Sequence, residues 1–119
     1  MEDNLTTVRE LRDFVDNFID ARDWTQFHSP KNLSISIALE AAELLEKFQW
    51  CDNAQSYKEA EKNKTEVEQE LADVIITALC FARATGIDIA KAVKKKMEIN
   101  GSNYPVDKAK GVCTKHNKL

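Results

Sequence analysis

The sequence predicts an all-α protein. Apolar residues recur at intervals of three and four over several stretches, which is the spacing of one face of a helix. No stretch forms a convincing strand. The chain has only three glycines and two prolines, and they fall where helices should begin or end. For 119 residues without an internal repeat, we expect a single bundle of four helices.

Capping signals mark the first two helices. Thr7 and Glu10 have the spacing of a capping box, and the helix that they open should end near Arg22. Its apolar stripe consists of Val8, Leu11, Val15, Phe18 and Ile19. The Ser29-Pro30 dipeptide supplies an N-cap and a proline at the first helical position. A second helix is therefore expected over residues 30–49.

Two further helices are expected after a short polar turn. The third, over residues 57–85, should stop at Gly86, because a glycine directly after a helix adopts the left-handed conformation at little cost. Asp88 is placed to cap a fourth helix that ends before Gly101. The lysine-rich remainder, from Ser102 onward, is expected to be irregular.

Two pairs of acidic residues stand out within these helices. Glu40 and Glu43 lie three residues apart on the second helix, and Glu70 and Asp73 repeat that spacing on the third. Residues three apart share a helix face, so antiparallel packing of the two helices would bring four carboxylates together. Such a group is costly unless a cation compensates its charge, and hard oxygen ligands favour magnesium, manganese or calcium over zinc. Glu66, one turn before Glu70, could add a ligand or a base.

Two other interpretations of the acidic residues remain open. Glutamates at helical spacing often form nothing more than a solvated helix face. A ferritin-like di-iron site is a second alternative, but it requires Glu-x-x-His pairs. The two histidines, His28 and His116, fall on an expected loop and in the tail, which disfavours di-iron.

Composition excludes several classes of function. The formal net charge of −3 gives no basic footprint for a nucleic-acid polymer. Three cysteines without metal-ligand spacing indicate reduced thiols, as expected in the cytoplasm. The N-terminus shows no signal peptide, and no stretch approaches the roughly 18 apolar residues of a membrane span.

Several short segments accompany the acidic pattern E-x-x-E, spacer, E-x-x-D. They are Arg22–His28, Pro30–Leu33, Phe48–Trp50, Lys96-Met97 with Asn100, and Tyr104–Val106. Together with the acidic residues, they resemble the MazG-like all-α nucleoside triphosphate pyrophosphohydrolases, and most closely the dCTP pyrophosphatase branch. The resemblance covers about residues 8–111, so we expect one domain over 1–111 and a polar tail over 112–119.

The resemblance implies an activity and a set of site residues. Members of the family hydrolyse a nucleoside triphosphate between the α and β phosphates, releasing a monophosphate and pyrophosphate. Their catalytic ligands for Mg²⁺, with Mn²⁺ as a possible substitute, correspond here to Glu40, Glu43, Glu70 and Asp73. The residues that would contact the nucleotide are Trp24, Phe27, His28 and Trp50 at the base, and Lys96 and Asn100 at the phosphates. Without the resemblance, the tryptophans could be plain core and the lysine a solvated surface residue.

The resemblance also implies an assembly and a role. It predicts a homo-oligomer, a dimer of dimers, with nucleotide pockets near subunit boundaries. It also predicts that the protein removes unwanted nucleotides from the cellular pool. Three positions depart from the dCTP pyrophosphatase pattern: Val15, Thr77 and Asn103 stand where a histidine, a tyrosine and an arginine are expected. Hydrolysis of a triphosphate is thus a firmer expectation than preference for dCTP. A non-catalytic helical module, either a nucleotide sensor or an oligomerisation partner, is the alternative.

Overall fold

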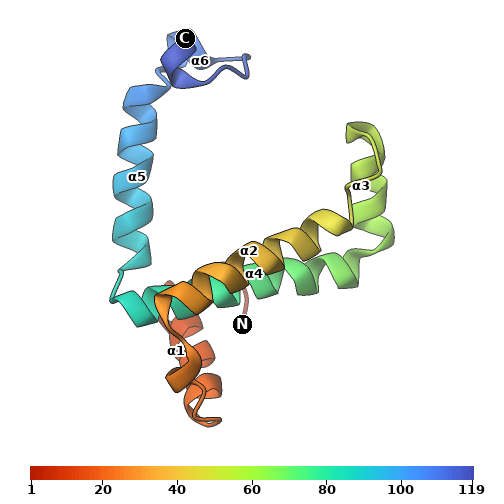
Figure 1. Ribbon diagram of the computed structural model, residues 1–119. Coiled ribbons are helices and arrows are strands. Elements are labelled where there is room, and N and C mark those ends of the chain that lie inside the picture. The colour runs from red at the N-terminus through yellow and green to blue at the C-terminus, as the bar shows by residue number, and fades with distance from the viewer. The chain divides into compact units, whose positions relative to one another are not determined.

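A computed structural model describes all 119 residues, and it contains six α-helices, two 3₁₀ turns and no strand (Figure 1). The predicted all-α class is therefore confirmed. The chain divides into two compact units, residues 1–86 and 87–119, and each is described by itself. None of the helices combines the length and the apolar character needed to cross a lipid bilayer.

The first unit is built on a pair of long helices. Helix α2 (Pro30–Glu46) and helix α4 (Lys64–Thr85) run antiparallel and lie side by side along most of their length (Figure 1). Helix α1 (Val8–Asp20) packs against α4, and the shorter α3 (Asn53–Lys62) connects the two long helices. The antiparallel packing that the acidic pattern required is present.

The predicted caps of the first two helices are confirmed. The Thr7 hydroxyl accepts a hydrogen bond from the Glu10 N–H at 3.1 Å, and the Glu10 carboxylate accepts one from the Thr7 N–H at 2.7 Å. At the start of α2, the Ser29 hydroxyl accepts from the Asn32 N–H at 3.1 Å. These bonds satisfy backbone donors that a helix leaves free in its first turn. The far end of α2 lies at Glu46, three residues before the predicted end.

The prediction of one helix over residues 57–85 is wrong, because two helices meet there. A capping box between Asp52 and Gln55, which was not predicted, starts α3 four residues earlier than expected. At Asn63 the backbone leaves the helical region, with φ −108° and ψ 31°. The Asn63 side-chain amide donates to the Glu59 carbonyl at 3.3 Å and to its carboxylate at 3.1 Å. An asparagine that bonds in this way competes with the backbone hydrogen bonds of a continuous helix.

Helix α4 ends as predicted. Gly86 has φ +68° and its N–H donates to the carbonyls of Ala82 and Arg83, which would otherwise lack partners at the helix end. A residue with a Cβ would pay a steric cost in this left-handed conformation, whereas glycine does not.

The second unit consists of α5 (Ile89–Asn103), the short α6 (Val106–Ala109) and a 3₁₀ turn at His116–Lys118. Asp88 caps α5 as predicted, with its carboxylate accepting from the Lys91 N–H at 2.9 Å. The predicted end before Gly101 is wrong, since the helix continues to Asn103. It stops there because the residue before Pro105 is sterically pushed out of the helical region. The tail, expected to be irregular, also contains α6.

The core of the first unit lies where α1 meets α4 and the beginning of α2. Its buried apolar residues are Val15, Ile19, Leu33, Leu79, Cys80 and Ala82. Arg83 of α4 ties α1 to this region, since its guanidinium lies 2.7 Å from the Asp20 carboxylate and 3.7 Å from that of Asp16. The hydrogen bond from Arg83 lowers the pKa of Asp20.

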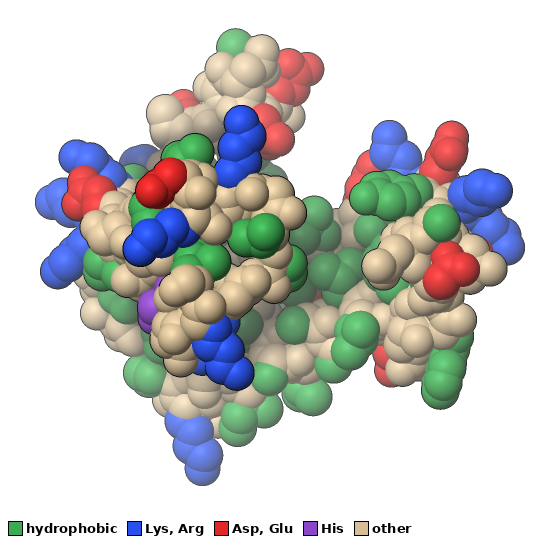
Figure 2. Space-filling model, turned by 90° about the horizontal axis from the view of Figure 1, so that it is seen from above, with side chains coloured by type: hydrophobic (Ala, Val, Ile, Leu, Met, Phe, Trp, Pro, Cys, Tyr) green, Lys and Arg blue, Asp and Glu red, His purple; other side chains and the backbone are tan.

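Many apolar side chains along α2 and α4 lie outside this core. Hydrophobic side chains remain visible at the molecular surface (Figure 2). On the two long helices, the ones between 38% and 60% exposed are Ile35, Leu39, Leu45, Leu71, Ile75 and Ile76. Within one chain, these side chains are therefore only partly covered.

Candidate functional site

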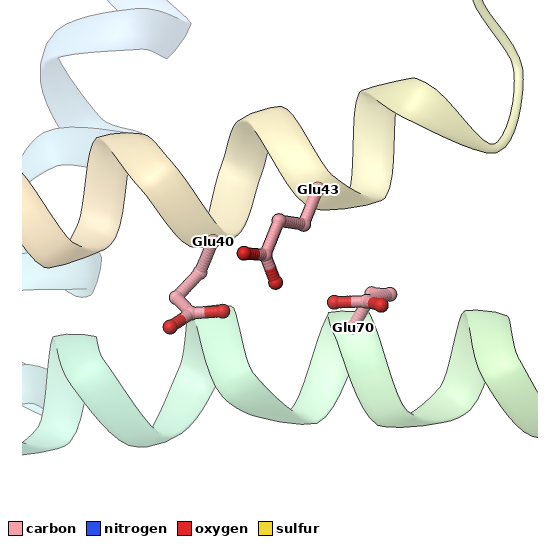
Figure 3. Close-up of side chains that lie close together, drawn as sticks. All are labelled: Glu40, Glu43 and Glu70. Carbon is pink, nitrogen blue, oxygen red and sulfur yellow. The ribbon is translucent and has the colours of Figure 1, made fainter.

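Three of the four predicted acidic ligands converge between α2 and α4. Glu40 and Glu43 point from α2 toward α4, and Glu70 points back from α4 (Figure 3). One carboxylate oxygen from each of the three lies within 4.8 Å of the others. The two helices thus bring together residues that are 27 to 30 positions apart in the sequence. We call Glu40, Glu43 and Glu70 the acidic cluster.

The electrostatics of the acidic cluster show the repulsion that the sequence analysis anticipated. Partial burial raises the pKa of Glu70 first of all, and the neighbouring carboxylate of Glu43 raises it further. Lys47 acts in the opposite direction but does not cancel these two effects. Three hard oxygen donors whose negative charge Lys47 only partly balances form a donor set that suits a divalent cation such as Mg²⁺.

Asp73, the fourth predicted ligand, is not one of the three converging residues. It lies one turn after Glu70 on α4, and its side chain is exposed. Its charge still contributes to raising the pKa of Glu70, so the two carboxylates affect one another. The role of Asp73 as a metal ligand stays a prediction.

Glu66 and Lys47 form an ion pair beside the acidic cluster. The Lys47 Nζ lies 2.9 Å from Oε2 of Glu66 and 4.0 Å from Oε1 of Glu70. This hydrogen bond to Glu66 raises the pKa of Lys47, which keeps the ammonium charged. Glu66 was predicted to lie beside the acidic residues, whereas Lys47 was not. The signal was available, since Lys47 follows Glu43 by four residues and therefore shares its helix face.

Trp24, Phe27 and His28 lie together in the segment between α1 and α2. Trp24 is 44% exposed and packs edge-on against Phe18, with ring centroids 5.8 Å apart. Phe27 is 60% exposed at the end of a 3₁₀ turn. His28 is half-buried and, with Thr25, lines a cavity of about 250 Å³.

Hydrogen bonds fix the conformation of this segment. The Thr25 hydroxyl donates to the Asp20 carboxylate at 3.1 Å, and the Asn32 side-chain amide donates to the Phe27 carbonyl at 3.1 Å. Asp23 has φ +52°, the one positive φ of a non-glycine residue in the chain. A backbone conformation of this kind costs free energy and persists only where surrounding contacts enforce it.

Trp50 lies in the turn after α2 and is 89% exposed. It lines a hollow of about 450 Å³ at this end of α2. The other residues around the hollow are Glu46, Lys47, Cys51, Gln55, Lys58 and Glu59. A core position for Trp50, which the sequence left open, is therefore wrong, whereas its predicted contact with the base stays a prediction.

The two tryptophans lie beyond opposite ends of α2. Trp24 precedes that helix and Trp50 follows it, and its 17 residues span about 25 Å. One chain therefore does not bring Trp24 and Trp50 to a common base. A pocket that used both would need residues from two copies of the chain.

Lys96 and Asn100 belong to α5 in the second unit. Lys96 is exposed, and Asn100 is half-buried with its side-chain amide 3.9 Å from the Met97 sulfur. Their predicted contacts with phosphate stay predictions.

This chain is similar to known proteins in sequence and in fold. The model of the MazG-like family matches residues 35–119. Curated relatives include dCTP pyrophosphatase 1 of Rattus norvegicus, which is 35% identical over 115 residues, and that of Homo sapiens, which is 32% identical over 115 residues. Each alignment covers 95% of this chain and 68% of the relative. The crystal structure of a pyrophosphatase from Archaeoglobus fulgidus is similar with a TM-score of 0.81 and 42% identity, covering 88% of this chain and 98% of that one.

Proposed function

Because the chain belongs to the MazG-like family and is a nucleotide pyrophosphohydrolase, we propose that it cleaves deoxynucleoside triphosphates between the α and β phosphates in a magnesium-dependent reaction. The products are the nucleoside monophosphate and pyrophosphate. One observation carries the proposal: the acidic cluster joins carboxylates from two different helices within 4.8 Å. The sequence places no nucleophilic serine or cysteine beside a histidine there, and hydrolysis by water needs none.

The donor set fits a divalent cation. Glu40, Glu43 and Glu70 would hold it, with Asp73 completing the set. The pKa of Glu70 is raised by burial first and then by the charge of Glu43, and a bound cation would compensate that charge. When bound, the ion would supply Lewis-acid activation of the phosphate and of the attacking water. The chain itself supplies the positioned carboxylates, and Mn²⁺ would substitute for Mg²⁺ at the same oxygens.

The preferred substrate in this proposal is dCTP or a related or modified pyrimidine deoxynucleotide. The curated relatives are named dCTP pyrophosphatases, which supports a pyrimidine. Two positions point to a preference different from theirs. Val15 is buried in the core, only 8% exposed, and the Thr77 hydroxyl donates to backbone carbonyls of its own helix, at 2.9 Å to that of Asp73. Neither side chain is placed to supply a polar contact to the base, so we expect a broader or altered range of substrates.

The proposal includes a homo-oligomer, assembled as a dimer of dimers. The half-exposed apolar residues of α2 and α4 need a partner surface, and a second copy of the chain supplies one of the same character. Assembly would also allow Trp24 of one subunit and Trp50 of another to meet at one nucleotide. The three cysteines are unpaired, as in a reducing compartment, and we place the reaction in the cytoplasm, where it would remove unwanted nucleotides from the pool.

A substrate panel tests the proposal. Purified protein is incubated with each dNTP and NTP, with and without Mg²⁺, and the products are separated chromatographically. We expect monophosphate and pyrophosphate in equal amounts, only with the metal. Formation of a diphosphate and inorganic phosphate, or no turnover of any nucleotide, would refute the proposed reaction.

Two variants localise the activity. Glu43→Gln removes one charge of the acidic cluster while keeping the size of the side chain, and it should abolish turnover. Glu68→Gln is the matched control, because Glu68 lies on α4 between Glu66 and Glu70, is 65% exposed and pairs only with Lys64. It should keep the wild-type rate.

A further inference from the structure

We infer that Lys47 contacts the triphosphate of the substrate and is a catalytic residue of the reaction proposed above. The inference rests on that proposed function and extends it, because metal binding by the acidic cluster does not by itself require a lysine. Three features of Lys47 carry the inference: where its ammonium lies, what else the residue touches, and which of its hydrogen-bond donors remain available.

The ammonium of Lys47 lies at the edge of the acidic cluster. Its Nζ is 4.0 Å from Glu70 Oε1, and its side chain is only 27% exposed, so the aliphatic stem is largely covered. Glu66 holds it there at 2.9 Å. Phosphate oxygens beside the acidic cluster would therefore lie within reach of this ammonium.

Lys47 also lines the 450 Å³ hollow that contains Trp50. Of the seven residues around that hollow, it is the one that forms an ion pair with a member of the acidic cluster. A nucleotide with its base on the exposed ring of Trp50 and its phosphates at the acidic cluster has to pass Lys47.

The hydrogen-bonding capacity of Lys47 is only partly used. An ammonium has three N–H donors. One is donated to Glu66 at 2.9 Å, and the 4.0 Å separation from Glu70 is too long for a hydrogen bond. Two donors therefore remain available for phosphate oxygens. Glu66, earlier considered as a ligand or a base, is on this basis a positioning residue for Lys47.

The experiment compares three variants in the full-length protein. Lys47→Met keeps most of the stem and removes the charge, and Lys47→Arg keeps the charge. Lys64→Met is the matched control, because Lys64 also pairs with a glutamate, Glu68 at 3.9 Å, but its side chain is 75% exposed and it forms no ion pair with the acidic cluster. Steady-state kinetics with dCTP and Mg²⁺ give KM and kcat for each. Quenching of tryptophan fluorescence gives the affinity for a triphosphate analogue that is not hydrolysed between its α and β phosphates, and for deoxycytidine.

We expect Lys47→Met to raise KM for dCTP by about 10- to 100-fold, the range for losing a hydrogen bond to a charged group. It should weaken binding of the analogue to a similar degree and leave binding of deoxycytidine unchanged. Lys47→Arg should recover most of the loss, and Lys64→Met should match the wild type.

If Lys47→Met binds the analogue as tightly as the wild type does, the inference is wrong and Lys47 only screens the carboxylates. Equal losses for the analogue and for deoxycytidine would also overturn it, because they would indicate a general disturbance of the site. These binding measurements stay informative even if the wild type hydrolyses no nucleotide, a result that would instead refute the proposed function.

Discussion

Replacing Trp50 with alanine should separate base binding from folding. Trp50 is 89% exposed, so only about 30 Å² of a side chain of roughly 250 Å² is covered in the structure. At about 25 cal/mol per Å², this burial contributes about 0.7 kcal/mol to the free energy of unfolding. A stacked base, in contrast, contributes about 1–3 kcal/mol, which corresponds to a rise in KM of roughly 5- to 150-fold. The variant should therefore fold almost as stably as the wild type and bind substrate much more weakly.

The measurement pairs two assays with a contrasting variant. Pyrophosphate release at varied dCTP concentration gives KM and kcat, and urea denaturation gives the free energy of unfolding. We expect little change in kcat, because the base lies away from the phosphate that reacts. Trp24→Ala provides the contrast: with 44% of this residue exposed, about 140 Å² is covered, worth about 3.5 kcal/mol of folding stability. An unchanged KM for Trp50→Ala with every nucleotide would refute its assignment to base binding, and a loss of several kcal/mol in stability would refute the burial argument.

Two further predictions concern the metal and the assembly. Mg²⁺ at 100 times its dissociation constant should stabilise the wild type by about 2.7 kcal/mol through mass action, whereas Glu43→Gln should lose both this effect and turnover. Without metal, that variant should be as stable as the wild type or slightly more so, since one repelling carboxylate is gone. Thermal denaturation with and without Mg²⁺ measures both effects. If Mg²⁺ stabilised the variant as much as the wild type, the acidic cluster would not be the metal site. Light scattering should report a multiple of the 13.5 kDa chain mass. A stable monomer at micromolar concentration would contradict the proposed homo-oligomer.

The features that local sequence determines were predictable. Thr7, Ser29 and Asp88 each accept a hydrogen bond from the backbone three residues later, and Gly86 ends α4 in the left-handed conformation. Each of these depends on a side chain and its nearest neighbours, so the residue type at a single position carries the information.

The interruption at Asn63 was not predictable in the same way. Residues on both sides of it favour a helix, and the break depends on whether the asparagine amide bonds to Glu59 or points to solvent. Residue preferences do not decide between these two states, because their free energies differ by little. The end of α2 was also not predicted, since residues 47–50 form a turn and not the last turn of the helix.

The convergence of Glu40, Glu43 and Glu70 was predictable because pairs of acidic residues with the same spacing occur on α2 and α4, although Asp73 of the second pair does not join them. Lys47 was not predicted, although the packing of α2 against α4 determines where it lies. Once Glu43 faces Glu70 in an antiparallel pair, the residue one turn after Glu43 must face the residue one turn before Glu70, which is Glu66. The pairing follows from the tertiary register of α2 and α4 and not from any motif.

The separation of the two tryptophans by the length of α2 makes thermodynamic coupling informative about assembly. Residues more than about 10 Å apart with no shared partner usually contribute additively to a free energy. Trp24 and Trp50 of one chain lie beyond opposite ends of a helix about 25 Å long and meet this condition. In a double-mutant cycle on nucleotide affinity, they should therefore show no interaction energy if each subunit binds its substrate alone. A sizeable interaction energy could arise only from rings in neighbouring subunits. Mutating these two residues of the chain would therefore report whether Trp24 of one subunit lies close to Trp50 of another.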